Sequence, residues 1–341
     1  MHPAVSVLID THNHERYVEQ AILSVLGQDF PASEVEIVVV DDGSTDRTAE
    51  IVGRFAPRVR LLQKKNGGQA SAFNAAIPEL RAEVVSLLDG DDWFAPAKLR
   101  LTMEALEANP EVAAAGHGFY EFHEAAGKTV ERIPDGSECF NLASPEAARD
   151  ARRGWPFLIV GALTVRKRAL AKILPINEGL TFCADGPIAL GSIAQGICIF
   201  RSPLCFYRHH ATNLHATGPT DDLRARRRFE VNESMFEAIE PLLLGLGVSR
   251  ECVAELLYPT WIPHSREGLT RFGTGRRRAF RTEIRAFQLD HKAPTLAYRV
   301  FKYASVGAAT MVLPPSLFYK AKGWYSRRSL GRLGQILARG R

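Results

Sequence analysis

The sequence predicts an α/β protein built on a doubly wound, mostly parallel sheet flanked by helices. Two observations carry this prediction. Short apolar runs rich in β-branched residues alternate with amphipathic segments of helical period, and several of these runs end in a polar or acidic turn. Buried parallel strands have this near-continuous apolar character, and their helical crossovers are right-handed. The 341 residues, 46% of them hydrophobic, suffice for one large domain or two small ones.

The predicted elements follow one another in strand and helix order. Four units come first, with strands at residues 5–9, 36–40, 59–63 and 83–88 and helices at 15–26, 45–55, 70–77 and 95–108. Ser44 or Thr45 is expected to cap the second helix. Beyond these units we expect strands at 112–122, 155–165 and 197–200, a polar surface segment at 124–153, and helices at 167–173, 188–195, 223–244 and 251–256. The predicted domains are a sheet domain (1–220), a helical region (221–290) and a basic tail (291–341).

Three carboxylates, Asp89, Asp91 and Asp92, follow the fourth predicted strand. The carboxyl end of a strand is where an open α/β sheet binds ligands, so these side chains are candidates for a functional site. Three acids within four residues repel one another and raise one another's pKa unless a cation lies among them. A hard divalent ion bridging to a phosphate, Mg²⁺ or Mn²⁺, is the simplest resident. The alternative is a solvated acidic turn that caps the following helix.

Four sequence motifs in a fixed order carry a family resemblance. They are Val5-Ser6-Val7-Leu8-Ile9 with Asn13, Val39-Val40-Asp41-Asp42-Gly43-Ser44, Asn66-Gly67-Gly68 with Asn74, and Leu88-Asp89-Gly90-Asp91-Asp92. Together they resemble the nucleotide-sugar domain of family 2 glycosyltransferases over residues 4–214. The resemblance implies a GT-A fold and transfer of a sugar from a nucleotide diphosphate, with inversion at the anomeric carbon. A UDP-sugar is the first expected donor, and a hydroxyl of a glycan or lipid-linked sugar is the expected acceptor.

The resemblance also assigns roles to individual residues. Asp91 is implied as the first ligand of Mn²⁺ or Mg²⁺, with Asp89 and Asp92 shared between metal, ribose and donor-sugar hydroxyls. A divalent ion would neutralise the charge that builds on the leaving diphosphate. Asp42 is implied to accept a hydrogen bond from the base, and a helix cap is its alternative role. The other residues expected around the donor are Asp10, Thr11, Asn13, Asp41, Ser44, Gly68 and Asn74.

Inversion by single displacement requires a base that takes the proton of the acceptor hydroxyl. The family places this base in a downstream Glu-Asp pair. This chain has Ala184-Asp185 in a matching context, so Asp185 is implied as the base although the Glu is absent. A structural carboxylate in a loop is the alternative role.

The cluster Tyr207-Arg208-His209-His210 resembles the Tyr-Arg-x-His segment of the family. By resemblance, His210 completes the metal shell or touches the diphosphate, and Arg208 pairs with a phosphate. A solvated turn is the alternative. A departure from the family pattern lies after the first strand, where many relatives have Pro-x-Tyr-Asn and this chain has Asp10-Thr11-His12-Asn13. The extra carboxylate of Asp10 puts base selectivity in doubt, unless Asp10 only anchors the loop.

The charge of the chain is unevenly distributed. Residues 291–341 carry ten Lys or Arg and no Asp or Glu, which leaves 33 basic against 38 acidic side chains in the first 290 residues. Tyrosines and Trp324 lie among these basic residues, and the apolar run 304–313 is too short to span a bilayer. The tail therefore predicts attachment to an anionic membrane surface. Nucleic acid is the competing partner but is not expected, and a solvated helical extension is the other alternative.

The five cysteines are odd in number and show no Cys-x-x-Cys spacing. This argues against a disulfide framework or a zinc site and for a reducing compartment. The first residues lack the basic and apolar regions of a signal peptide. We therefore expect a cytoplasmic protein, peripheral on the inner face of the cell membrane.

Two other functional classes stay open. A sugar nucleotidyltransferase also binds a nucleotide on an α/β sheet, but it would be expected to carry a Gly-rich, basic loop where this chain has Asp10-Thr11-His12-Asn13. A catalytically inactive nucleotide-sugar-binding module is the second, because the Glu before Asp185 is absent. A dinucleotide oxidoreductase is disfavoured, since no Gly-x-Gly-x-x-Gly follows the first strand.

Overall fold

The computed structural model describes residues 2–211, 213, 222–273, 275–289, 306, 308–320 and 322. The chain divides into two compact units, one of Met1–Thr220 and Ser234–Val253 and the other of Asp221–Glu233 and Ala254–Arg341. Helix α8 (Asp222–Gly245) contributes residues to both. The predicted domain bounds stay a prediction, and each unit is described separately.

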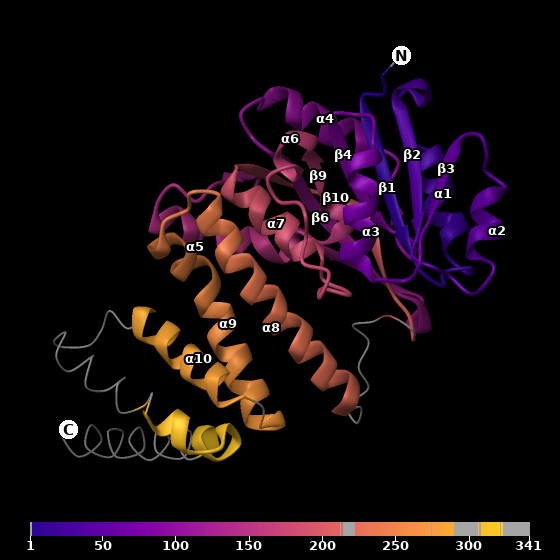
Figure 1. Cartoon of the computed structure of the whole chain (residues 1–341). Coiled ribbons are helices and arrows are strands. Elements are labelled where there is room, and N and C mark those ends of the chain that lie inside the picture. Colours follow the sequence, from indigo (N-terminus) through magenta and orange to yellow (C-terminus); the bar gives the residue numbers. More distant parts are fainter. Residues whose placement is uncertain are drawn as a thin grey trace. The chain divides into compact units, whose positions relative to one another are not determined.

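A ten-stranded sheet forms the first unit, in the order β3-β2-β1-β4-β9-β6-β10-β5, with β7 beside β6 and β8 beside β10 (Figure 1). β1 pairs in parallel with β2 and β4, β2 with β3, and β6 with β10, whereas β9 runs antiparallel between β4 and β6. The strands are β1 (Val5–Thr11), β2 (Val35–Asp41), β3 (Val59–Gln63), β4 (Val84–Asp89), β5 (Trp93–Phe94), β6 (Ala114–His123), β7 (Lys128–Arg132), β8 (Glu138–Phe140), β9 (Thr164–Arg166) and β10 (Ile197–His209).

Helices follow the strands as the strand and helix alternation predicts. In the first unit they are α1 (Val18–Leu26), α2 (Thr48–Gly53), α3 (Gln69–Ala76), α4 (Lys98–Ala108), α5 (Pro145–Gly154), α6 (Lys167–Leu170) and α7 (Asp185–Ala194). Residues of α1, α2 and α4 share a core with the sheet face that carries Val5, Val7 and Ile9. Because side chains alternate along a strand, Ser6 and Leu8 face the other side, where both are fully buried. Burial of both faces confirms the predicted fold class.

The register of the central strands explains where a site can form. Asp10 on β1 lies beside Asp89 on β4, and Thr11 lies beside Asp41 on β2. These residues end their strands, so the carboxyl ends of β1, β2 and β4 meet at one edge of the sheet. Polar side chains at this edge need not be covered by the flanking helices, which is where open α/β sheets place ligand sites.

One prediction for the middle of the chain is incomplete and another is wrong. The segment 124–153, expected to be a polar surface segment, is mostly exposed, but it also contains β7, β8 and α5, which were not predicted. Helix α5 begins with a strong local signal, because Ser144 Oγ accepts a hydrogen bond from the Ala147 amide and Pro145 occupies the first turn. The strand expected at 155–165 is reduced to β9 after two 3₁₀ turns, one of which contains Pro156. Proline cannot donate to a sheet ladder, which breaks the strand there.

Three element ends also differ from the sequence prediction. Helix α2 begins at Thr48 after Arg47, so neither Ser44 nor Thr45 caps it. Strand β10 continues to His209, which places the polar cluster on a strand and not in a turn. Helix α9 (Arg250–Phe272) extends through two prolines, well past the predicted end.

Cys139 and Cys198 form a disulfide between the antiparallel neighbours β8 and β10. The expectation that the cysteines stay unpaired is wrong for this pair. The two residues are 59 positions apart, so only the strand pairing brings them together. Cys183, Cys205 and Cys252 take no part in a disulfide among the described residues.

The second unit contains α9 from Ala254 onward, α10 (Arg276–Leu289) and the first part of α8. Its core includes Phe229, Leu269, Ala279, Phe318 and Tyr319. Tyr319, expected at a membrane surface, is therefore a buried core residue. Most of the predicted tail lies outside the described residues. Across the residues that the structure covers, no helix combines the length and the hydropathy needed to cross a bilayer.

The fully buried Lys98 on α4 makes a testable contribution to stability. Its Nζ donates to Thr164 Oγ1 at 2.8 Å and to Ser86 Oγ, and burial lowers its pKa from 10.5 to about 7. Above pH 7 the unfolded chain keeps the proton and the folded chain does not, so the free energy of unfolding should rise with pH up to about 10. The rise contributed by this group is at most about 4 kcal/mol.

Lys98→Met keeps the volume and removes the titration. We expect the variant to lack this part of the increase, as measured by urea unfolding of both proteins at pH 7 and pH 9.5. Equal pH slopes for the two proteins would contradict a neutral buried lysine.

Candidate active site

The acidic motif after β4 forms a compact turn. The Asp92 amide donates to the Asp89 carbonyl at 3.1 Å, and the carboxylate oxygens of Asp89, Asp91 and Asp92 lie within 4.8 Å of one another. Gly90 is required here, because a Cβ at this position would approach Thr11 Oγ1 to 2.6 Å. The structure therefore brings the three predicted carboxylates together at the edge of the sheet.

Asp10 adds a fourth carboxylate to this cluster. Burial raises the pKa of Asp10 to about 7, and burial together with Asp10, Asp92 and Asp91 raises the pKa of Asp89 well above its usual value. Burial and the neighbouring Asp91 do the same for Asp92. Among the described residues, Asp10 Oδ1 and Asp92 Oδ2 are buried without a hydrogen-bond partner. Buried acceptors that are left unpaired are costly, and a divalent cation would satisfy them.

Asp91 differs from its neighbours because two imidazoles face it. His210 Nε2 donates to Asp91 Oδ2 at 2.9 Å, and His14 Nε2 lies 3.8 Å from the same oxygen. Burial opposes ionisation of Asp91, but the hydrogen bond from His210 and the charge of His14 leave its pKa below the usual value. Asp91 is thus the carboxylate of this cluster that is most readily ionised. A role of His210 in binding a metal or the diphosphate stays a prediction.

Arg208 donates hydrogen bonds to the acidic turn from both its backbone and its side chain. Its amide donates to Asp92 Oδ1 at 2.8 Å and its Nε to the Asp91 carbonyl at 2.8 Å. The guanidinium lies over the rings of Trp93 and Tyr17, 4.5 and 4.8 Å from their centres. These contacts give Arg208 a positioning role, while its pairing with a donor phosphate stays a prediction.

Asp42 is bound by the glycine loop that precedes α3. Its carboxylate accepts from Lys64 Nζ at 2.6 Å and from the amides of Gly67 and Gly68 at 3.0 and 2.6 Å. Asp42 is not a helix cap, since α2 begins only at Thr48. The contact to a base stays a prediction, and the structure shows that Asp42 fixes the loop.

The remaining predicted donor residues connect the loops around the site. The Asn13 amide donates to Ser44 Oγ at 2.8 Å, and Asn13 Oδ1 accepts from the Thr45 amide at 2.8 Å. The Ser44 amide donates to Asp41 Oδ1 at 2.9 Å. Thr11 is buried, with Oγ1 3.2 Å from His14 Nδ1. These contacts join the ends of β1 and β2 beside the acidic turn.

Asn74 lies further along α3 and has a different partner. Its Nδ2 donates to the Ile176 carbonyl at 2.8 Å, and its Oδ1 accepts from the Ile176 amide at 2.8 Å. Both groups of the amide therefore bind the loop before α7. A role for Asn74 in donor binding stays a prediction.

Gln69, which the sequence prediction missed, connects the acidic cluster to Asp185. Its Nε2 donates to Asp89 Oδ1 at 3.0 Å, and its Oε1 accepts from the Ala184 amide at 3.0 Å. Asp185 begins α7, and burial raises its pKa to about 6. Its charge contributes to the raised pKa of Asp89. The structure thus brings the predicted base and the predicted metal ligands into one site.

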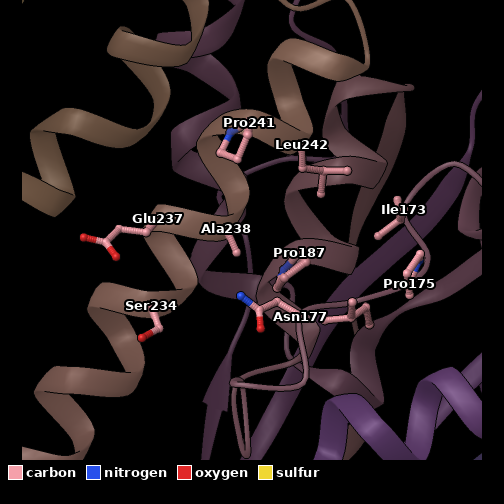
Figure 2. Close-up of a pocket in the computed structure, with 10 residues that line it drawn as sticks. Ile173, Pro175, Asn177, Pro187, Ser234, Glu237, Ala238, Pro241 and Leu242 are labelled. Carbon is pink, nitrogen blue, oxygen red and sulfur yellow. The ribbon is translucent and has the colours of Figure 1, made fainter.

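A pocket of about 410 Å³ lies beside α7 (Figure 2). Pro187 on the first turn of α7 lines it together with Ser234, Glu237 and Pro241 of α8 and Asn177 of the preceding loop. The lining is mixed, with apolar rings and polar side chains together.

A substitution at Gly68 tests whether the glycine loop is as tightly packed as the structure shows. Its φ is +86°, and a Cβ there would lie 2.6 Å from Thr181 Cα. Gly68→Ala should therefore lower the free energy of unfolding by about 1–3 kcal/mol and move Gln69 away from Asp89. The matched control is Gly53→Ala, because a Cβ on Gly53 of α2 meets nothing within 4 Å. Equal unfolding midpoints for both variants in a thermal melt would contradict the tight loop.

Comparison with known proteins identifies the family of this chain. The family model for glycosyl transferase family 2 matches residues 6–174. An uncharacterized glycosyltransferase from Nostoc sp. is 30% identical over 251 residues, which is 71% of this chain and 76% of that relative. This chain belongs to glycosyltransferase family 2. It is therefore a glycosyltransferase, and neither a nucleotidyltransferase nor an inactive binding module is favoured.

Two further similarities help to place this family 2 glycosyltransferase. Poly(ribitol-phosphate) β-N-acetylglucosaminyltransferase TarS of Staphylococcus aureus is 38% identical over 93 residues, 26% of this chain and 16% of TarS. The crystal structure of S. aureus TarS 1–349 in complex with UDP matches with a TM-score of 0.59 and 18% identity, over 89% of this chain and 90% of that chain. At this identity the match shows the fold, and it confirms the predicted GT-A class.

Three side chains of the site were missing from the sequence prediction: Gln69, Lys64 and His14. Gln69 directly follows the glycine loop, at the start of α3, and this position was its only local signal. His14 lies in a loop with several polar residues, none of which stands out before β1 and β4 are paired. Their roles depend on contacts between segments that are distant in the sequence.

Proposed function

We propose that this family 2 enzyme transfers a sugar from a nucleoside diphosphate donor to a hydroxyl of a glycan or lipid-linked acceptor, with inversion and with Asp185 as the base. The observation that carries the proposal is the bridge formed by Gln69, which binds both Asp89 and the backbone beside Asp185. A single site thus offers carboxylates that can hold a metal ion and, through the ion, the diphosphate. Across Gln69, the same site offers a carboxylate for the acceptor.

The acidic residues fit a hard divalent ion, Mn²⁺ or Mg²⁺. Asp91 and Asp92 would hold the ion, with Asp89 beside them and His210 completing the set. Asp92 Oδ2 is buried and has no hydrogen-bond partner within the part of the chain that the structure describes, which supports this assignment. The clustering of one carboxylate oxygen from each of the three aspartates within 4.8 Å supports it as well. When bound, the ion would neutralise the charge that develops on the departing diphosphate.

Asp185 is suited to accept a proton. Burial raises the pKa of this carboxyl to about 6, which makes it a stronger base than an exposed aspartate and still ionised at neutral pH. As the acceptor oxygen bonds to the anomeric carbon, the bond from that carbon to the diphosphate breaks. The hydroxyl proton passes to the Asp185 carboxylate, and the nucleoside diphosphate leaves on the opposite face of the sugar.

The donor is proposed to be a UDP-sugar. TarS, which shares 38% identity with this chain over 93 residues, is named as a β-N-acetylglucosaminyltransferase, so UDP-GlcNAc is the first donor to test. We place part of the acceptor in the pocket beside α7, because Pro187 at its edge follows closely after Asp185. The mixed polar and apolar lining of the pocket supports a glycan or lipid-linked sugar.

The basic tail is proposed to rest on an anionic membrane surface at the inner face of the cell membrane. Within its described part, Met311, Val312 and Leu317 are 47%, 72% and 55% exposed, which supports contact with an apolar interface. Truncation would remove Phe318 and Tyr319 from a core, so Arg327→Gln with Arg328→Gln is the cleaner variant. Vesicles containing phosphatidylserine should bind this variant more weakly than the unaltered protein. Equal flotation of both proteins would refute the proposal.

A panel of donors tests the transfer activity. Release of nucleoside diphosphate should be measured with UDP-, GDP- and dTDP-sugars in Mn²⁺ and in excess chelator. We expect release from a UDP-sugar that depends on the metal and increases with a glycan acceptor. Release from other donors alone would overturn the donor class, and equal rates in chelator would overturn the metal.

A further inference from the structure

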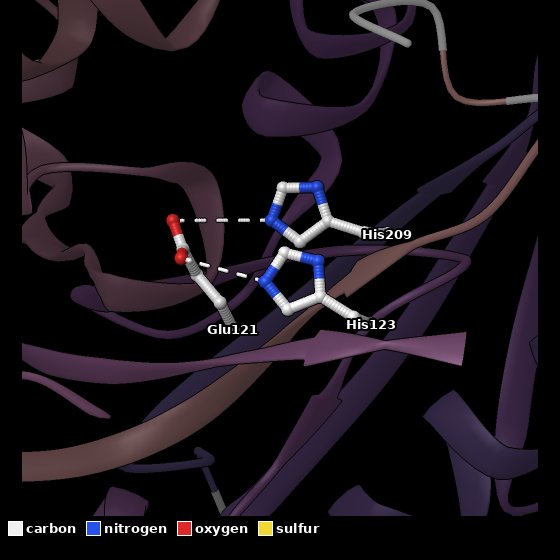
Figure 3. Close-up of side chains that lie close together, drawn as sticks. All are labelled: Glu121, His123 and His209. Atoms are coloured by element: carbon white, nitrogen blue, oxygen red, sulfur yellow. Dashed lines mark ion pairs between the residues drawn. The ribbon is translucent and has the colours of Figure 1, made fainter. Parts of the chain in front are cut away.

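A second group of metal-ligating side chains lies apart from the acidic turn. Glu121 and His123 end β6, and His209 ends β10 (Figure 3). In the parallel pairing of these strands, His123 lies beside His209 and Glu121 lies beside Tyr207. Because side chains alternate along a strand, Glu121, His123 and His209 share one face of the sheet. The positions of the three side chains are therefore set by the pairing of two strands and not by a loop.

The donor atoms of the three side chains converge. Glu121 Oε2 lies 3.8 Å from His123 Nε2, and Glu121 Oε1 lies 3.8 Å from His209 Nε2. The imidazole rings are stacked, 4.4 Å apart at an interplanar angle of 5°, with both Nε2 atoms directed at the carboxylate (Figure 3). One ligand atom from each residue falls within 4.8 Å of the others.

The hydrogen bonding of the cluster is incomplete. At 3.8 Å neither imidazole is close enough to donate to Glu121. His209 Nε2 is buried and has no hydrogen-bond partner among the described residues. Arg132 Nη2 donates to Glu121 Oε2 at 2.7 Å. The other carboxylate oxygen, Oε1, faces His209. A cation placed between the three side chains would bind the unpaired nitrogen and remain compatible with Arg132.

We propose that Glu121, His123 and His209 form a binding site for Zn²⁺ or a similar borderline metal ion. In a tetrahedral zinc site with bonds near 2.0–2.1 Å, neighbouring ligand atoms are roughly 3.4 Å apart, so the 3.8 Å separations from Glu121 must close slightly. The two stacked rings must also tilt, so that both Nε2 atoms point at one ion. Arg132 acts as the outer partner that orients the carboxylate. The side chains of His123 and His209 are 39% and 36% exposed, so the two rings have room to turn toward an ion, and a water can take the fourth position.

The proposed site differs in chemistry from the acidic turn and does not rest on the proposed function. Imidazole ligands suit zinc, whereas a carboxylate cluster suits Mg²⁺ or Mn²⁺. Zinc would join the ends of β6 and β10 immediately before His210, the residue that binds Asp91. Zinc binding should therefore stabilise the first unit, with a readout that requires no substrate.

Zinc binding to the untagged, metal-free protein, measured by competition with a chromophoric chelator, tests the proposal. We expect one tight site in the unaltered protein and an affinity at least about 100-fold lower in the His123→Asn, His209→Asn double variant. Zinc should raise the melting temperature of the unaltered protein and not that of the double variant. His2→Asn is the matched control, because His2 is an exposed imidazole remote in sequence from both sites.

Two results would overturn the proposal. One is tight zinc binding that survives in the double variant and is lost in Asp91→Asn, since the ion would then lie in the acidic turn. The other is the lack of any tight zinc site in the unaltered protein. Should the double variant unfold, Glu121→Gln serves in its place, and the visible spectrum of Co²⁺ bound to the unaltered protein must show the intense bands of tetrahedral coordination.

Discussion

Replacing Asp185 by Asn should lower the turnover number by about 10²–10⁴-fold, the contribution usual for a general base. The amide has nearly the same shape but cannot take the proton of the acceptor hydroxyl. Because the proposed donor site lies on the other side of Gln69 from Asp185, the dissociation constant for UDP in the presence of Mn²⁺ should change little. Calorimetry measures the binding of UDP. The release of nucleoside diphosphate measures turnover, so the two effects are separated.

The pH dependence provides a second readout for the same residue. With a pKa of about 6, Asp185 is ionised above pH 6 and protonated below it, so transfer by the unaltered enzyme should fall as the pH drops through about 6. The variant should lose this inflection. Asp150→Asn on the exposed face of α5 is the matched control. Unchanged turnover in Asp185→Asn would reject Asp185 as the base.

Asp91→Asn is the second substitution with a large expected effect. Asp91 is the carboxylate whose pKa stays below its usual value, because His210 and His14 face it. An amide there removes the ionised ligand, so binding of UDP that depends on Mn²⁺ should weaken by about 100-fold or more, together with turnover. Titration of UDP in Mn²⁺ and in chelator isolates the metal-dependent part.

The fold of the variant needs its own control. Removing one charge from a cluster of four acids relieves repulsion, so metal-free Asp91→Asn should melt no more than a few degrees below the unaltered protein. A variant that stays folded and still binds UDP more tightly in Mn²⁺ than in chelator would show that Asp89 and Asp92 hold the metal without Asp91.

The first half of the fold could be predicted from the sequence because its signals are local. The strands β1 to β4 are apolar runs that end in turns, and the structure places them within two residues of the predicted ends. The GT-A class, the acidic turn and the candidate base came from motifs whose order resembles a known family. The missed helix α5 also had a local signal at Ser144, where a capping residue precedes Pro145.

The rest of the site depends on contacts that no local pattern specifies. Gln69 acquires its role only when the loop before α7 reaches the end of β4. The sequence could not show that the Arg208 guanidinium lies over the rings of Tyr17 and Trp93, and its contact with a donor phosphate stays a prediction. The pairing of Cys139 with Cys198 likewise follows from the antiparallel contact of β8 with β10.

The central claim is a single displacement in which one base, Asp185, deprotonates the acceptor. The anomeric configuration of the new glycosidic bond, recorded by proton NMR of the first transfer product, tests this mechanism. With an α-linked donor such as UDP-GlcNAc, we expect a β-linked product from the unaltered enzyme. An α-linked product would show retention of configuration and would contradict the mechanism.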